Sequence, residues 1–349
     1  MKKKNQHYVP KFYLRNFSDE GRNISLYNFN NDRFIPTASI KNQACSNFFY
    51  GEDEIIEKYF SIIEGAASKH IKEILENKVL PKYHSKPYFH LLMFMMTLGL
   101  RTPKAIDDMN EHLNKSLELF AQYDKRLSLF KDGEYRIELT DPVVSQIDLL
   151  EKNFHYVTDL RIKVIVNRTS LPFITSDSPI VKYNEYLEKR GYKYGFEGYG
   201  GMGLQIFLPI SPTMMLMFYD GWTYKVSDKK VDFIETNSLN DVKCINLLQA
   251  IYSKNQLFFD KSSSEEQIRG IVMESKKYRE LNKIDYENIG DYEHPDGKLS
   301  KRFSFGPAPI RINPNFTFTR ITKNAKRYKF NDYAIQLRDE RKRYLPDDY

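Results

Sequence analysis

LQIFLPISPTMMLMFYD, residues 204–220, is the stretch that decides the fold of this chain. It consists of two apolar runs on either side of the turn residues SPT, and the same texture recurs in RIKVIVN at 161–167 and PFIT at 172–175. Short runs of apolar or β-branched residues between turn residues are typical of strands. The pattern predicts a mostly antiparallel sheet in the part of the chain that follows residue 158.

The sequence on either side of these strands predicts helices and one further strand. Towards the C-terminus we expect a helix from about Ile234 to Ala250 and a strand at QLFFD, residues 256–260. Towards the N-terminus, apolar residues recur at three- and four-residue steps over 53–130 and again over 142–157, which predicts a helical region. Its most hydrophobic part, YFHLLMFMMTLGL at 88–100, is too short to span a bilayer and predicts a buried helix. We therefore expect no membrane association.

Before this helical region, near the N-terminus, the chain carries an aromatic-rich segment, NQHYVPKFYLRNF at 5–17. Proline is tolerated in the first turn of a helix because its missing N–H has no partner there, so Pro10 predicts a helix over 11–17. A β-hairpin is predicted next, with strands ISLYNF and DRFIPTA around Asn30 and Asn31, which tolerate positive φ.

The fold class predicted from these patterns is α+β, with an N-terminal β-hairpin and a helical region packed against a mostly antiparallel sheet. We expect a single domain over 1–260, with 5–157 as its mainly helical half and 158–260 as its mainly β half. A basic, aromatic-rich extension then follows over 261–349.

The basic charge of the chain lies in that extension. From Lys301 onward there are twelve Lys and Arg against five Asp and Glu, which accounts for the whole net charge of +7. Cations interleaved with aromatic residues suit phosphate contact and base stacking, so nucleic acid, above all RNA, is an expected partner. The alternative is a solvated extension that packs by its aromatic residues.

Composition also limits the compartment and the metal chemistry. The chain is 41% hydrophobic and 14% aromatic, which is ample for a sizeable core. Cys45 and Cys244 stand far apart, with no CxxC pair and no histidine at ligand spacing, so neither a zinc site nor a disulfide framework is indicated. The opening MKKKNQHYVP turns polar at once and does not look like a signal peptide. We therefore expect a reduced, cytoplasmic setting.

GYGGMG, residues 198–203, matches the dinucleotide-binding pattern G-x-G-x-x-G letter for letter. The segment before it is polar rather than a strand, and a strand rather than a helix follows, so no helix N-terminus is available for a pyrophosphate. This context predicts a glycine-rich loop that enters a strand.

Two polar motifs are candidates for a site. TSDSP at 175–179 follows a strand, and Asp177 is placed to ligate a metal or to orient a histidine, unless its carboxylate caps its own turn. Arg101, in the RTP that follows the buried helix, has a guanidinium fork suited to a phosphate or a carboxylate, unless it forms a buried structural ion pair. Arg15 has the same two readings.

His7 is the one histidine in a dense, polar and aromatic stretch. Its imidazole suits general acid–base chemistry, with Gln6, Tyr8 and Arg15 nearby, whereas the alternative is a bond to the backbone at a helix start. The other histidines considered lie on or beside predicted helices, where an ordinary core or surface role is common: His84, His90, His112 and His155. The motifs HExxH and GxSxG and a Walker lysine loop are absent.

In chain order, QHYVPKFYLRNF, RTP, ITSDSPIV, FLPISP and a late AIYS resemble the bacterial family known as domain of unknown function 4238, over roughly 5–260. The family often has Asn where this chain has Ser178 and Leu where it has Ile210. The resemblance implies a cytoplasmic bacterial protein, with some members associated with anti-phage defence, and it implies no established reaction. Carried over by position, the motif residues are Gln6, His7, Tyr8, Pro10, Arg15, Arg101, Pro103, Asp177, Pro179 and Pro212.

These observations lead to a hypothesis of a defence effector that cleaves RNA. His7 is then the general acid or base, and Asp177 orients it or binds a divalent ion such as Mg²⁺. The expected substrate contacts are Gln6, Tyr8, Arg15, Arg101 and Ser178.

Two alternatives come from other functional classes. One is a non-catalytic sensor that binds a phage protein, as a trigger, or a small ligand. The other is a hydrolase or transferase of a nucleotide-like small molecule.

Overall fold

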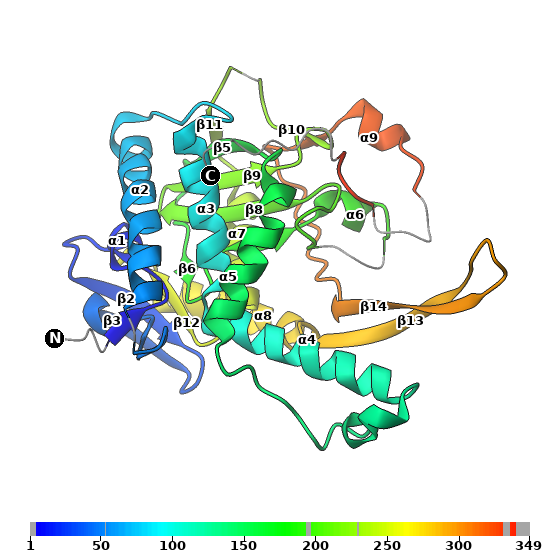
Figure 1. The fold of residues 1–349 in the computed structure, drawn as a ribbon. Coiled ribbons are helices and arrows are strands. Elements are labelled where there is room, and N and C mark those ends of the chain that lie inside the picture. Colours follow the sequence, from blue (N-terminus) through cyan, green and yellow to red (C-terminus); the bar gives the residue numbers. More distant parts are fainter. Residues whose placement is uncertain (1–4, 53, 193–196, 229, 331–335, 340–349) are drawn as a thin grey trace.

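The computed structural model describes residues 5–52, 54–192, 197–228, 230–330 and 336–339. They form an α+β structure in which two main sheets lie among helices, and this confirms the predicted fold class (Figure 1).

The larger sheet has five strands in the order β11-β5-β9-β8-β7, and every pair of neighbours is antiparallel except β11 and β5. The two apolar runs around SPT form its β8 and β9, and RIKVIVN forms β5, as predicted. The strands are β5 (Arg161–Asn167), β7 (Val181–Tyr183), β8 (Gln205–Ser211), β9 (Met214–Tyr219) and β11 (Phe233–Thr236).

Both faces of β8 and β9 are buried because alternate side chains enter two different cores. Leu208 and Leu216 pack in the core that holds most of the buried side chains of the first helices, whereas Phe207 and Met217 pack in a second core with α7. The prediction of a buried helix at 88–100 is confirmed by α3, and no helix of the described residues is long and apolar enough to cross a membrane. The covering helices are α2 (Ile55–Asn77), α3 (Lys86–Leu100) and α5 (Pro142–Asn153) on the first core and α7 (Leu239–Tyr252) on the second.

The second sheet joins segments that are far apart in the sequence, in the antiparallel order β3-β2-β12-β6. Its β2 and β3 are the predicted hairpin, although the positive φ of the turn falls on Asp32 rather than on Asn30 or Asn31. Because β12 lies between β2 and β6, it holds the TSDSP segment beside the N-terminal hairpin. The strands are β2 (Asn23–Asn28), β3 (Arg33–Ser39), β6 (Thr175–Ser176) and β12 (Gln256–Phe259).

Two predicted elements differ from the structure. The predicted helix 234–250 is wrong at its start, because Ile234 lies in β11 and α7 begins only after Ser238, whose side chain accepts the N–H of Asp241. Of the predicted strand PFIT only Thr175 lies in a strand, β6, because the preceding amides bond elsewhere, that of Ile174 to the side chain of Asn246.

The N-terminal segment forms one short strand and one short helix. β1 (Asn5–His7) pairs with β4 (Cys45–Asn47), and α1 (Lys11–Arg15) starts after Pro10 and ends two residues before the predicted end.

The described residues beyond 263 also contribute to the cores. Ile268 and Val272 of α8 pack beside β12, and Ile310 and Phe316 are buried in the same core as α7. The remaining elements are α4 (Pro103–Ala121), α6 (Glu185–Lys189), α8 (Glu265–Leu281), α9 (Lys323–Arg327), the long hairpin of β13 (Ile284–Glu293) and β14 (Leu299–Pro307), and the pair β10 (Tyr224–Lys225) and β15 (Arg320–Ile321). Short 3₁₀ turns lie at η1 (Ile40–Asn42), η2 (Lys125–Phe130) and η3 (Phe154–Val157).

Candidate functional site

Gln6 and His7 are held by the strand pairing of β1 and by a neighbouring loop. The buried amide of Gln6 accepts the N–H of Tyr50 at 2.6 Å and donates to the carbonyl of Gly51 at 3.1 Å. The hydroxyl of Tyr50 donates to the His7 carbonyl at 3.0 Å. The Gln6 side-chain amide therefore pairs with backbone groups as a peptide group would, and this fixes the loop before α2.

Tyr8 and Arg15 lie in different environments. The Tyr8 ring is buried 5.2 Å from that of Phe49, and burial first, with the Asp177 carboxylate second, raises the pKa of Tyr8 well above its ordinary value. Arg15, in the last turn of α1, is exposed. The structure thus brings Tyr8 within electrostatic range of Asp177.

The carboxylate of Asp177 caps a loop. It is fully buried and accepts the backbone N–H groups of Lys254 at 2.8 Å, Asn255 at 2.6 Å and Gln256 at 3.1 Å. Arg279 of α8 also holds this loop, because its guanidinium donates to the carbonyl of Lys254 at 3.0 Å. Burial raises the pKa of Asp177 to about 6, and the three amide bonds oppose this shift.

Arg101 and Ser178 connect the RTP and TSDSP motifs to their surroundings. The buried Arg101 guanidinium forms an ion pair with Glu64 at 2.7 Å and lies 4.8 Å from the centre of the Phe60 ring. The Ser178 hydroxyl donates to that of Thr102 at 3.5 Å. The motif segments therefore meet in space, and the contacts of Arg101 and Asp177 described here are structural ones. The substrate and catalytic roles expected for Gln6, His7, Tyr8, Arg15, Arg101, Asp177 and Ser178 stay predictions.

Beside these motifs lies a cavity of about 960 Å³ that Ser178 and Thr102 help to line. Its walls come from α4, from the segments around Lys182 and Glu197, from the end of α7 and from the base of the β13–β14 hairpin. The volume is at the upper end of the range for small-molecule sites, which is about 300–1,000 Å³. Polar and aromatic residues that line it include Lys104, Asp108, His112, Lys182, Glu197, Tyr199, Tyr252, Asn282, Tyr286 and Phe305.

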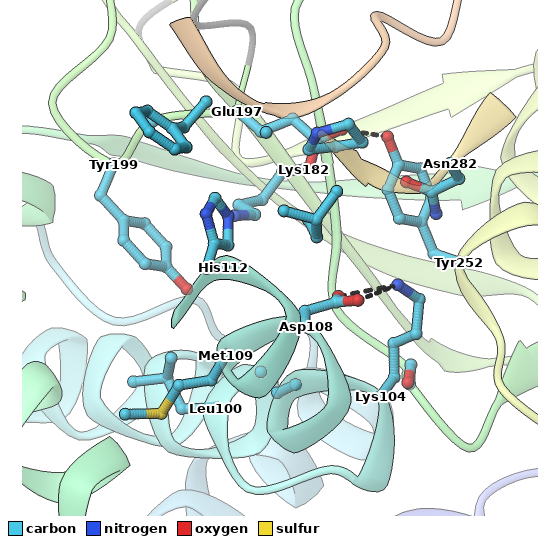
Figure 2. Close-up of a pocket in the computed structure, with 18 of the residues that line it drawn as sticks. Leu100, Lys104, Asp108, Met109, His112, Lys182, Glu197, Tyr199, Tyr252 and Asn282 are labelled. Carbon is cyan, nitrogen blue, oxygen red and sulfur yellow. Dashed lines mark hydrogen bonds and ion pairs between the residues drawn. The ribbon is translucent and has the colours of Figure 1, made fainter. Parts of the chain in front are cut away.

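Helix α4 presents one row of titratable side chains to this cavity. The helix starts cleanly because the Thr102 side chain accepts the N–H of Ala105 at its N-cap. Lys104, Asp108 and His112 then recur at four-residue steps on the same face, as Figure 2 shows. Lys104 and Asp108 form an ion pair at 2.5 Å.

Across the cavity from α4, a glutamic acid and a tyrosine face each other (Figure 2). The Tyr252 hydroxyl donates to Oε1 of Glu197. Burial is the main cause that raises the pKa of Glu197, and Lys182 opposes the shift. A carboxyl group in this setting keeps its proton to a higher pH than an exposed one, which makes Glu197 a candidate proton donor.

The pKa of His112 is shifted in the opposite direction, downward. Burial lowers its pKa, Lys182 lowers it further, and the Asp108 carboxylate raises it. The neutral imidazole is thus favoured near pH 7 and can accept a proton. Asp108 and Lys182 also act on the pKa of Glu197, so the two groups belong to one electrostatic cluster.

Lys182 is the cation of the cavity that is available to a ligand. Its Nζ lies 4.8 Å from the centre of the Tyr199 ring, and within the described part of the chain it forms no ion pair. It is only partly exposed, and a partly desolvated cation attracts an anionic group more strongly than a solvated one.

This cluster is not among the site residues predicted from the sequence. The spacing of Lys104, Asp108 and His112 on one predicted helix face is a usable signal for it, although the sequence alone predicts an ordinary helical role for His112. Glu197 directly precedes the glycine loop, which enters β8 as predicted, and nothing in the sequence pairs it with Tyr252, 55 positions later.

The loop 198–203 is shaped by its last glycine. Gly203 has a φ of +79°, and a Cβ there would lie 2.5 Å from Oδ1 of Asn184. The loop contributes Tyr199 to the cavity and is followed by a strand rather than a helix.

Within the described residues, no group of three or more His, Cys, Asp or Glu side chains is arranged to hold a metal ion. The divalent ion expected at Asp177 stays a prediction.

Comparison with known proteins gives one finding. The model of a family described as "Protein of unknown function (DUF4238)" matches residues 5–263, which is well over half of the chain. No protein of curated function matches the chain, and no solved structure does. The match ends before α8, so the hairpin wall of the cavity lies outside it.

Proposed function

The chain belongs to the DUF4238 family of proteins of unknown function, and we propose that it is a hydrolase or transferase of a small nucleotide-like molecule. One observation carries the proposal: the side chains of Lys104, Asp108, His112, Lys182, Glu197 and Tyr252 converge on a single cavity of about 960 Å³. Burial shifts the pKa of His112, Glu197 and Tyr252, and such shifted groups gathered in a concave pocket are a recognised sign of an active site.

The cavity offers two complementary kinds of contact for such a ligand. Lys182 is placed to hold an anionic group such as a phosphate, and the Lys104–Asp108 pair borders the same space. Aromatic surface from Tyr199 and Phe305 is available to a planar ring. A nucleotide combines one anionic end with one planar end, so it matches both.

Because both groups line the cavity and their pKa shifts are opposed, we take His112 as the base and Glu197 as the acid. His112, neutral near pH 7, takes the proton of an attacking water or hydroxyl group, whose oxygen forms the new bond at the reacting atom. As the bond to the leaving group breaks, Glu197 gives that group its proton. Lys182 stabilises the negative charge that develops on the reacting phosphate or carbonyl oxygen. The Tyr252 hydroxyl positions Glu197.

The cleavage of RNA in a cytoplasmic anti-phage response is a second candidate function, and a different surface favours it. Residues Lys323, Lys326 and Arg327 of α9 are exposed, and Tyr328 beside them is 38% exposed. Basic groups next to an exposed ring suit single-stranded nucleic acid.

The test of the main proposal is a survey of turnover. The purified full chain is incubated with nucleoside mono-, di- and triphosphates, dinucleotides and total RNA, and products are followed by ³¹P NMR and chromatography. We expect conversion of a soluble nucleotide with the RNA intact, and a loss of roughly 10²–10⁴-fold in Glu197→Gln, which keeps the shape but not the proton. Glu266→Gln, exposed on α8 and not among the residues that line the cavity, is the matched control and keeps the wild-type rate. Equal activity of Glu197→Gln and wild type would overturn the proposal, as would RNA cleavage with every nucleotide unchanged.

A further inference from the structure

The described C-terminal residues 336–339 cross the glycine loop that borders the cavity. The N–H of Met202 donates to the carbonyl of Gln336 at 2.7 Å, and the N–H of Arg338 donates to that of Gly200 at 2.9 Å. Leu337 pairs with Gly201 as an antiparallel bridge. A C-terminal segment thus pairs with this loop through one β-bridge and two backbone hydrogen bonds.

The side chain of Arg338 anchors the crossing. It is 4% exposed and forms an ion pair with Asp159, with Nε 2.9 Å from Oδ2. Its Nη1 donates to the carbonyl of Gly201 at 2.6 Å, and its Nη2 donates to the carbonyls of Tyr199 at 2.7 Å and of Tyr156. One guanidinium therefore ties the loop to the segment that precedes β5.

The loop held in this way carries cavity residues. The ring of Tyr199 lies in the wall of the cavity, while the carbonyl of the same residue accepts from Arg338. Glu197 stands two positions before Tyr199, directly ahead of this loop. A shift of about 1 Å in catalytic groups is enough to lower a rate strongly, so the backbone position of this loop matters to the chemistry.

We propose that Arg338 is a positioning residue that holds the glycine loop, with Tyr199 on it and Glu197 directly before it, in the geometry needed at the cavity. The inference rests on the proposed function of that cavity. The family match covers residues 5–263, so the residue that completes this site comes from the C-terminal extension. Arginine suits the task because its planar fork has five fixed donors, whereas a lysine has a single charged nitrogen.

The single tryptophan reports on whether the extension stays docked. The Thr322 hydroxyl donates to the Trp222 carbonyl at 2.9 Å, and the Tyr328 ring lies 5.6 Å from that of Trp222. Unchanged Trp222 emission in a variant therefore means that the part of the extension around α9 has kept its place.

Hydrogen exchange tests the anchoring without any substrate. In Arg338→Ala we expect the Met202 amide, which bonds to the C-terminal segment, to exchange at least tenfold faster than in wild type. The Gly203 amide bonds instead to the Asp220 carboxylate at 2.9 Å and serves as the internal control, with an unchanged rate. Unchanged exchange at Met202 would overturn the anchoring, whatever the cavity does.

Turnover tests the consequence for the site. With Trp222 emission as in wild type, Arg338→Ala is expected to raise KM for the nucleotide and to lower kcat at least tenfold, and Arg338→Lys to recover part of the loss. The control Arg320→Ala, at an exposed position of the same extension, keeps wild-type values. Faster exchange at Met202 with wild-type kinetics would refute the positioning role. If wild type transforms no nucleotide, the proposed function fails while the exchange result still stands.

A second variant, Asp159→Asn, tests the same contact if Arg338→Ala fails to fold. Asp159→Asn removes only the charge of the carboxylate partner, which is 7% exposed, and leaves the carbonyl contacts in place. It is expected to speed exchange at Met202 less than Arg338→Ala does. No change in Asp159→Asn, together with an unfolded Arg338→Ala, would count as a purely structural role and contradict the proposal.

Discussion

Replacing Asp177 by asparagine tests whether this motif residue is a structural cap. In the structure its two oxygens accept three backbone N–H groups in the loop 254–256 while the carboxyl group is fully buried. Asparagine keeps one oxygen, and its NH₂ group then faces the N–H of Lys254 or of the next two residues. At pH 8 the substitution has two opposing effects on stability: it removes a hydrogen bond, and it removes a buried negative charge. The change of stability with pH depends on the carboxyl group alone and is therefore the better measurement.

The size of the expected change in the free energy of unfolding follows from the shifted pKa of Asp177. Burial raises the pKa of Asp177 from 3.8 to about 6, so the folded state binds the proton more tightly than the unfolded state. The resulting stabilisation is present at low pH and is lost as the pH rises through about 6. Between pH 8 and pH 5 this linkage amounts to about 1.4 kcal/mol for one such group.

The assay is urea denaturation of wild type and Asp177→Asn at several pH values, since other titrating groups cancel in the difference. We expect the free energy of unfolding of wild type, relative to the variant, to increase by about 1.4 kcal/mol from pH 8 to pH 5. A difference that stays constant or decreases over this range would refute the reasoning, because the carboxyl group would then not be a buried one with a raised pKa. Lost turnover with a constant difference would favour a catalytic Asp177.

Two further substitutions probe the contacts that bring the motifs together. Glu64→Ala leaves the buried Arg101 guanidinium without its ion pair and is expected to destabilise the chain by about 3 kcal/mol, whereas the double variant with Arg101→Met loses less. Wild-type stability of the single variant in denaturation would contradict this. Tyr13→Phe removes a buried hydroxyl that contacts Thr175 at 2.7 Å and a carbonyl of β8, with an expected loss of about 1–3 kcal/mol. The exposed Tyr135→Phe, changed by less than about 0.5 kcal/mol, is its control, and equal melting of the two would speak against the contact.

The strands of the larger sheet were predictable because their pattern is local. β8 and β9 are nearly continuous apolar runs and β5 is a β-branched run broken by Lys163, and their length and turn residues define all three. The start of α7 was not predictable in the same way, because Ile234 suits a helix or a strand and only its pairing with β5 decides. The same holds for PFIT, whose amides are taken by partners distant in sequence, such as Asn246.

The candidate site was predictable only in part. The motif segments around Asp177 and Thr102 were expected to matter, and the structure brings them together beside the cavity. The chemistry proposed here depends on Glu197 and Tyr252, which meet only through the packing of a loop on the end of α7. No spacing in the sequence encodes that contact, and burial, which shifts the pKa of Glu197, is a property of the folded chain alone.

The two histidines offer the most direct test of the central claim. Turnover of nucleotides and cleavage of RNA are measured side by side for wild type, His112→Asn and His7→Asn. Because His112 lines the cavity and His7 is not among the residues that line it, we predict that His112→Asn loses nucleotide turnover and that His7→Asn retains it. Loss of activity in His7→Asn, with His112→Asn as active as wild type, would contradict the account and place the chemistry at the N-terminal motif.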